Sequence, residues 1–147
     1  MLKEDAKLLN YLFLHQHRLI THNMLQCNVR GVENGYPLII EVEEVDGAIE
    51  EIPSAFDSEQ IKILARKINW KCLLSAARNI EFPMQIFEDC EDTPADSMLS
   101  NDSFLMSVHK LLFDIHVNKG YLICPESGRK FPIKDGIPNM LLHEDEV

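Results

Sequence analysis

The sequence predicts a mixed α+β protein, with a small antiparallel sheet built from both ends of the chain and helices between them. Two observations indicate this fold class. Short apolar segments separated by turn signals occur near both termini, whereas apolar residues in the middle of the chain recur at helical spacing. The chain has 147 residues, of which 46% are hydrophobic, so it is long enough to bury one ordinary core.

The N-terminal strands are expected to follow an extension of different character. Residues 1–17 carry a weak helical stripe, which we interpret as an appended helix or arm. Residues 18–21 are strand-like, and residues 36–45 read as a strand in which Leu38 and Ile40 share one face. This pattern is typical of a sheet with one covered side.

The C-terminal strands are expected to follow a hairpin signal at Asn118–Gly120. Predicted strands cover residues 121–124 and 130–133, and a last apolar segment covers residues 137–142. Strands joined by such tight turns run antiparallel, so these segments predict an antiparallel sheet.

Three helices are expected between the two groups of strands. Asp57 can cap the first, Asn69 the second, and Asn101 or Asp102 the third. Trp70 begins the apolar stripe of the second helix, so we expect its side chain in the core rather than stacked on a nucleic-acid base.

Charge is segregated along the chain. Residues 41–59 hold eight acidic residues and residues 81–102 hold seven, with no basic residue in either segment. We interpret residues 88–102 as an exposed acidic loop. Residues 60–80 hold no acidic residue, and their five basic residues are Lys62, Arg66, Lys67, Lys71 and Arg78.

Composition excludes several classes of function. A formal net charge of −10 argues against a protein that binds bare nucleic acid alone, because the phosphate backbone would repel it. Membrane insertion and secretion are not indicated, because no apolar stretch approaches 18 residues and no signal peptide is recognisable. An enzyme acting alone is not indicated either, since the chain has no phosphate loop and no dinucleotide fingerprint.

The basic segment leaves one alternative open. A free-standing RNA-binding module could use Lys62, Arg66, Lys67 and Lys71, which form two pairs four residues apart. A solvated helix face, balanced by the acidic segments on either side, is the simpler interpretation.

The cysteines indicate an incomplete metal site. Cys124, Ser127 and the glycine after them have the form of half a zinc knuckle in which serine replaces the second thiolate. Cys27 is the plausible ligand on the far side, but Val32 stands five residues later, and two cysteines do not close a structural zinc site. We expect all four cysteines to be reduced. The alternative is a mixed site that uses the imidazoles of His22, His109 and His116.

The C-terminal segment carries more apolar surface than its short strands can bury. Residues 137–142 follow two small strands that must also bury Phe131 and Ile133. Apolar surface beside an unpaired strand edge is what a partner protein covers, by strand addition and side-chain insertion. The alternative is that the helices or the N-terminal arm cover it.

Two blocks of the sequence closely resemble a known family. The first block contains RLITHNML, CNVRGV and GYPL within residues 18–38, and the second contains CPESGR, FPI and GIPNMLL within residues 124–142. Both resemble the eukaryotic multifunctional methyltransferase activator, the small subunit shared by several tRNA, ribosomal-RNA and release-factor methyltransferases. The similarity runs from about Arg18 to the end of the chain.

This resemblance implies a fold and a mode of action. Residues 18–46 and 117–147 would form a zinc-ribbon-like domain, and residues 47–116 an inserted helical lobe. The subunit would not be catalytic. It would form 1:1 heterodimers with S-adenosylmethionine-dependent methyltransferases of tRNA, rRNA and the termination factor in cytoplasm and nucleus. The partner would bind S-adenosylmethionine, and RNA would be contacted only through the complex.

The resemblance also implies which residues meet the partner and whether metal is bound. Fungal members of the family hold zinc with four cysteines. This chain has cysteine at two of these positions, Cys27 and Cys124, and has Val32 and Ser127 at the other two, so no zinc is expected. The expected interface residues are Thr21, Asn23, Phe131, Ile133, Ile137, Pro138, Asn139, Met140 and Leu141.

Overall fold

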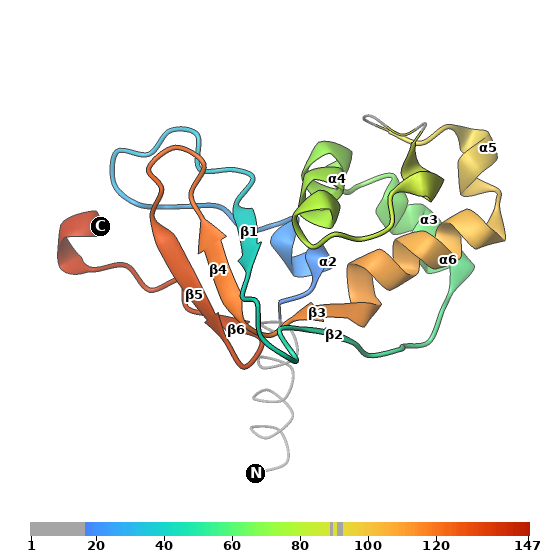
Figure 1. The fold of residues 1–147 in the computed structure, drawn as a ribbon. Coiled ribbons are helices and arrows are strands. Elements are labelled where there is room, and N and C mark those ends of the chain that lie inside the picture. The colour runs from blue at the N-terminus through green and yellow to red at the C-terminus, as the bar shows by residue number, and fades with distance from the viewer. Residues whose placement is uncertain (1–16, 89, 91–92) are drawn as a thin grey trace, which may run out of the picture.

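The computed structural model describes residues 17–88, 90 and 93–147, so the helix or arm predicted over residues 1–17 lies, except for His17, outside the described residues. The molecule has a sheet on one side and helices on the other, with the short helix α2 (Leu19–His22) between them (Figure 1). The predicted mixed α+β class with antiparallel sheets is confirmed. No helix among the described residues is both long and apolar enough to cross a membrane.

The main sheet has four antiparallel strands in the order β1-β4-β5-β6, drawn from both halves of the chain. Its strands are β1 (Ile39–Val42), β4 (Gly120–Ile123), β5 (Lys130–Lys134) and β6 (Ile137–Pro138). Leu38 and Ile40 are buried while Ile39 and Glu41 are exposed, as the alternation of apolar and polar residues predicts.

A second sheet of two strands joins the beginning and end of the helical segment. The strand β2 (Ile49–Glu51) pairs antiparallel with β3 (Ile115–Val117). The sequence did not predict β2, because its residues are all exposed and lie in an acidic stretch without apolar alternation. Pairing with the buried strand β3, rather than its own pattern, makes this segment extended.

The three main helices begin at the predicted capping residues. Side-chain oxygens of Asp57, Asn69 and Asn101 accept hydrogen bonds from backbone N–H groups in the first turns. The helices are α3 (Ser58–Ala65), α4 (Trp70–Asn79) and α6 (Asp102–His109). A π-helical turn, η2 (Lys110–Asp114), continues α6 and carries its apolar stripe to β3.

The prediction of a strand over residues 18–21 is wrong for residues 19–21, which belong to α2, whereas Arg18 is extended and forms an isolated bridge with His116. Leu19 and His22 are both buried. In a strand, two residues three apart would point to opposite faces, whereas in a helix they share one face. The helical conformation therefore allows Leu19 and His22 to be buried on the same side.

The acidic loop predicted over residues 88–102 is wrong in part. It contains the one-turn helix α5 (Asp96–Leu99) and follows the 3-10 turn η1 (Gln85–Phe87). Phe87, Cys90 and Leu99 are buried, so three apolar side chains anchor a segment whose composition otherwise favours solvent. Near the C-terminus, the first two residues of the apolar segment 137–142 form the strand β6, and a short turn, η3 (Glu144–Glu146), follows the segment.

One continuous core connects the sheet to the helices. From the sheet side come Leu38, Ile40, Leu122 and Phe131, and from the helices Trp70, Leu73, Phe104 and Leu105. Trp70 is buried against Phe104 and its indole N–H donates to the carbonyl oxygen of Ala65 at 2.7 Å. The predicted core role of Trp70 is confirmed.

Candidate functional site

An apolar groove runs along α2 and reaches the C-terminal segment. Its C-terminal half has a volume of about 530 Å³. The lining residues are Thr21, Leu25, Ile137, Pro138, Asn139, Met140 and Leu141. The fold therefore brings together Thr21 and the five C-terminal residues that are predicted at the interface, although more than 100 residues separate them along the chain.

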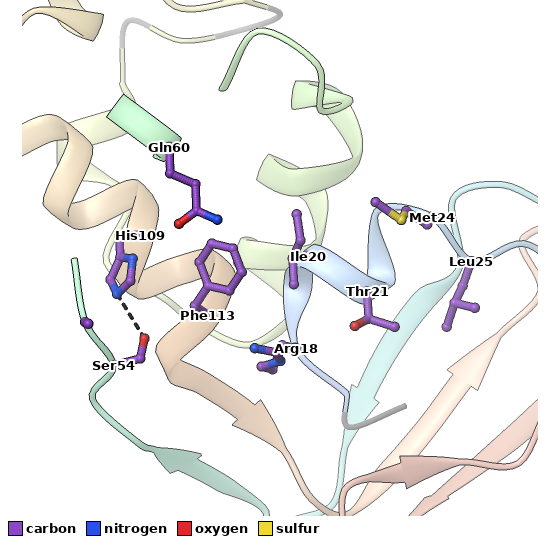
Figure 2. A pocket seen from close by; sticks show the side chains of 10 residues that line it. Arg18, Ile20, Thr21, Met24, Leu25, Ser54, Gln60, His109 and Phe113 are labelled. Carbon is purple, nitrogen blue, oxygen red and sulfur yellow. Dashed lines mark hydrogen bonds between the residues drawn. The ribbon is translucent and has the colours of Figure 1, made fainter. Parts of the chain in front are cut away.

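The other half of the groove lies between α2 and the helices, and has a volume of about 500 Å³ (Figure 2). Thr21 and Leu25 line both halves, so the two halves are neighbours. The remaining lining residues are Arg18, Ile20, Met24, Ser54, Ala55, Gln60, His109 and Phe113. Sequence reasoning did not place these residues at an interface. The strand predicted over residues 18–21 would turn Ile20 and Thr21 to opposite faces, whereas α2 and the turn after it bring Ile20, Thr21, Met24 and Leu25 to the same groove.

Several groove side chains are exposed to an unusual degree for their type. Leu141 is 78% exposed, Met24 is 76% exposed and Ile137 is 39% exposed. Thr21, Pro138 and Met140 are half-buried. Neighbouring apolar side chains left open to water in this way are typical of a surface that binds another protein.

Two residues predicted at the interface lie in the core instead. Phe131 is fully buried and Ile133 is 4% exposed. In β5 the side chains alternate, so Phe131 and Ile133 point into the core while Lys130, Pro132 and Lys134 point to solvent. These two residues support the groove from beneath and offer no surface to a partner in the isolated chain.

Asn23, a third predicted interface residue, has a structural role in the isolated chain. Its Nδ2 donates to the backbone oxygen of Asn69 at 2.9 Å, and its Oδ1 accepts from the backbone N–H of Asn69 at 2.9 Å. Both polar atoms of the side chain therefore tie the end of α2 to the start of α4.

Three polar side chains hold one wall of the groove. The Ser54 hydroxyl donates to Asp114 Oδ1 at 2.6 Å, and His109 Nε2 lies 3.0 Å from the same hydroxyl. Since the Ser54 proton is given to Asp114, His109 Nε2 donates to Ser54 and cannot take its proton. The three residue types of a hydrolase triad are present, but their arrangement anchors the segment around Ser54 and does not activate a nucleophile.

A second polar contact holds the C-terminal segment against the sheet. Arg129 Nε donates to Glu146 Oε2 at 2.7 Å, and the guanidinium lies 4.7 Å from the ring centre of Phe131. The Arg129 guanidinium lowers the pKa of Glu146 to about 2. Because Arg129 Nη2 also lies 3.4 Å from the carbonyl oxygen of Leu141, this contact positions the exposed end of the groove.

Cys27 and Cys124 lie next to each other and are buried. Burial raises the pKa of the Cys27 thiol. Burial acts on Cys124 in the same direction, but hydrogen bonds from Ser127, from the backbone of Glu126 and from Cys27 together lower its pKa. Two thiols without further donors do not fit tetrahedral zinc, and the described residues contain no group of three or more His, Cys, Asp or Glu suited to a metal ion.

The histidines considered for a mixed metal site have partners within the chain. His22 Nε2 donates to the carbonyl oxygen of Leu38 at 2.9 Å, and its Nδ1 lies 3.1 Å from His17 Nε2. His109 is bonded to Ser54 as described above. His22 and His109 are therefore held by hydrogen bonds within the chain.

The fold and the groove define a small α+β protein that presents a docking surface to another protein. The chain belongs to the Trm112p-like protein family, whose sequence signature matches residues 18–136. It is 46% identical to the multifunctional methyltransferase subunit TRM112 homolog A of Arabidopsis thaliana over 88% of this chain and 99% of that one. It is 39% identical to the TRM112-like methyltransferase subunit of Bos taurus over 88% of this chain and 98% of that one.

A similar solved structure is a chain of the Mtq2–Trm112 complex of E. cuniculi, which is described as responsible for methylation of the eRF1 translation termination factor. The TM-score is 0.49 at 19% identity, over 85% of this chain and 95% of that one.

Proposed function

We propose that this chain is the non-catalytic activating and stabilising subunit of S-adenosylmethionine-dependent methyltransferases that act on tRNA, rRNA and the translation termination factor. The observation that carries the proposal is the apolar groove along α2, in which Met24, Ile137 and Leu141 stand exposed in the isolated chain. Relatives that share 39–46% of its residues over nearly their whole length are named methyltransferase subunits, which supports this role.

The groove explains how such a subunit would stabilise an enzyme. A partner that seats apolar side chains in it removes both surfaces from water, at roughly 25 cal/mol for each Å² of apolar area. Association and ordering costs offset much of this gain. The remainder stabilises the folded partner by mass action, as any ligand of the native state does.

The edge of the main sheet supports strand addition. Among the residues that the structure describes, β6 is the last strand in the order β1-β4-β5-β6 and pairs on one side only, with β5. It runs directly into Asn139, Met140 and Leu141 of the groove. A strand of the methyltransferase could therefore add to β6 while its side chains enter the groove. The main-chain hydrogen bonds would supply affinity, and the side-chain contacts would supply specificity.

The same proposal assigns the chemistry to the partner. S-adenosylmethionine would be bound by the methyltransferase in a 1:1 heterodimer, this subunit would hold no cofactor and no zinc, and no membrane partner is involved. Residues 18–46 and 117–147 would act as the zinc-ribbon-like docking domain, without its metal. The expected places of action are the cytoplasm and the nucleus.

The alternative function is a free-standing RNA-binding module. Its four cations belong to a chain with a net charge of −10, which disfavours RNA binding without a partner. The two proposals differ in a simple measurement: the isolated chain should show little affinity for tRNA at physiological salt if it is an activating subunit.

The proposal is tested with the substitution Leu141→Glu in a heterodimer reconstituted with a methyltransferase that co-purifies with the tagged chain from its native cells. Leu141 is 78% exposed, so the variant should fold normally. Burying a carboxylate in place of an apolar side chain should weaken the heterodimer by about 2–3 kcal/mol, or roughly 30- to 150-fold in Kd. Isothermal titration calorimetry measures this directly.

Val45→Glu is the matched control, because Val45 is 49% exposed and lies outside both halves of the groove. It should leave the Kd unchanged. An unchanged Kd for Leu141→Glu would reject the groove as the surface that binds the methyltransferase. The recovery of RNA and ribosomal proteins without any methyltransferase in the purification would reject the proposed function.

A further inference from the structure

A group of cations lies at the turn between α3 and α4. Arg66 and Lys67 form this turn, and Lys71 lies in the first turn of α4. All three side chains are exposed. Residues 60–80 contain no acidic residue, so this turn is a local positive surface on a chain of net charge −10. We call Arg66, Lys67 and Lys71 the basic turn.

The basic turn borders the groove. Asn69, which lies between Lys67 and Lys71 in the chain, is held by Asn23 at the end of α2 through two hydrogen bonds. Met24, the residue after Asn23, lines the groove and is 76% exposed. The basic turn therefore lies beside the exposed end of α2.

The helix α3 leads from the groove to the same turn. Gln60 lines the groove, and Ile63 follows three residues later on the same side of the helix, which ends at Ala65, two residues before Lys67. Ile63 is 56% exposed. The basic turn would thus lie beside a partner seated in the groove and outside the contact itself.

Arg66 and Lys67 are not neutralised as other cations of the chain are. Lys110 pairs with Glu51 at 3.3 Å, Lys130 pairs with Glu41 at 3.4 Å, and Arg129 pairs with Glu146 at 2.7 Å. Within the part of the chain that the structure describes, neither Arg66 nor Lys67 forms an ion pair. Their charge is available to an anionic partner.

We infer that the basic turn binds the RNA phosphate backbone in the heterodimer, as an extension of the methyltransferase's own RNA-binding surface. This inference rests on the proposed function, because the isolated chain carries too much negative charge to retain RNA. The partner in the groove brings RNA to the border where Arg66 and Lys67 are exposed. Each cation that meets a phosphate releases counterions, so the contact adds affinity without reading sequence.

The test uses the heterodimer with a tRNA methyltransferase, a fluorescently labelled unmodified tRNA transcript, and the double variant Arg66→Glu/Lys67→Glu. The variant should form the heterodimer with unchanged Kd, because both side chains are exposed and outside the groove lining. Its affinity for tRNA, measured by fluorescence anisotropy, should fall by about tenfold. The slope of log Kd against log salt should fall by roughly one to two. In steady state, KM for tRNA should rise while kcat changes little.

The control is Arg30→Glu/Arg78→Glu, which makes the same charge change at two exposed positions. Arg30 lies in the loop before β1 and Arg78 in the last turn of α4. This control should keep the tRNA affinity and the salt slope of the unsubstituted heterodimer, which separates a local contact from an effect of net charge.

The outcomes distinguish the two proposals. If the unsubstituted chain forms no heterodimer, the proposed function fails. If the heterodimer forms and methylates tRNA but the double variant keeps the same tRNA Kd and salt slope, the RNA contact is rejected while the proposed function stands. If the double variant instead weakens the heterodimer at unchanged RNA affinity, the basic turn binds an acidic surface of the methyltransferase, which also overturns the RNA contact.

Discussion

At the scale of single residues, two buried histidines couple the fold to pH. His22 Nε2 donates to the carbonyl oxygen of Leu38, so its Nδ1 must accept the Nε2 proton of His17. Burial, together with the neighbouring His22, lowers the pKa of His17 to about 3, and burial lowers the pKa of His22 to about 4. Both imidazoles are therefore neutral in the folded chain near pH 7.

The sign of the pH effect follows from these values. A histidine in the unfolded chain has a pKa of about 6.5. Below this pH the unfolded chain binds protons at both histidines while the folded chain does not, so the free energy of unfolding falls with falling pH. The loss begins near pH 6.5 and continues toward pH 4, with about 1.4 kcal/mol per pH unit from each histidine. Above pH 7.5 the two histidines add no pH dependence.

The substitution His17→Gln tests this coupling. A Gln side-chain amide can donate to His22 Nδ1 but does not titrate. Between pH 6 and pH 4.5 the variant should lose stability less steeply than the natural chain, by about 1.4 kcal/mol per pH unit, in urea unfolding at a series of pH values. Equal slopes for the two chains would mean that His17 is protonated in the folded state.

Single residues also show which features of the groove the sequence predicts and which it does not. The exposure of Ile137 and Leu141 could be predicted, because apolar side chains beside a short strand exceed what a small sheet can bury. Phe131 was assigned to the same surface, yet its place on β5 turns it into the core. Choosing between the two faces of a strand requires its register in the sheet, which is set by contacts distant in sequence.

At the scale of elements, the helices with side-chain caps could be predicted and α2 could not. Asp57, Asn69 and Asn101 act on N–H groups two or three residues away, so the signal is contained in the local sequence. The helix α2 has no side-chain cap and only four residues. Its conformation depends on packing against distant elements, and a short apolar segment does not by itself distinguish a helix from a strand.

The contact between α2 and α4 is tested by the substitution Asn23→Ala. It removes two hydrogen bonds between Asn23 and the backbone of Asn69, so the free energy of unfolding of the isolated chain should fall by about 1–2 kcal/mol. Urea unfolding measures the change. Met24→Ala is the comparison, because Met24 is 76% exposed and its truncation should cost less than about 0.5 kcal/mol.

A loss of stability confined to Asn23→Ala would establish Asn23 as a structural residue of the isolated chain. If Asn23→Ala instead kept the stability of the isolated chain and weakened only the heterodimer, its hydrogen bonds to Asn69 would contribute nothing measurable. Asn23 would then act at the interface, as the family resemblance implies.

At the scale of the whole molecule, the groove depends on both halves of the fold. Its C-terminal half lies against β6 and its other half against α3 and α6, with α2 shared between them. The sequence divides into a sheet-forming part and a helical part, but it does not reveal that α2 and the core join them. That relation arises only when residues near position 20 meet residues near positions 113 and 140.

A continuous core predicts that the isolated chain unfolds in one cooperative step. Trp70 is the only tryptophan, is buried among the helices and reports their unfolding by fluorescence. Leu122 and Phe131 belong to the same core cluster on the sheet side, so the sheet should lose its packing together with the helices. Urea unfolding followed by Trp70 fluorescence and by NMR signals of β4 and β5 should give the same midpoint and the same m-value, about 1–3 kcal/mol/M. Two separated midpoints would show that the helical part and the sheet are independent units, and the groove between them would then require the partner to complete it.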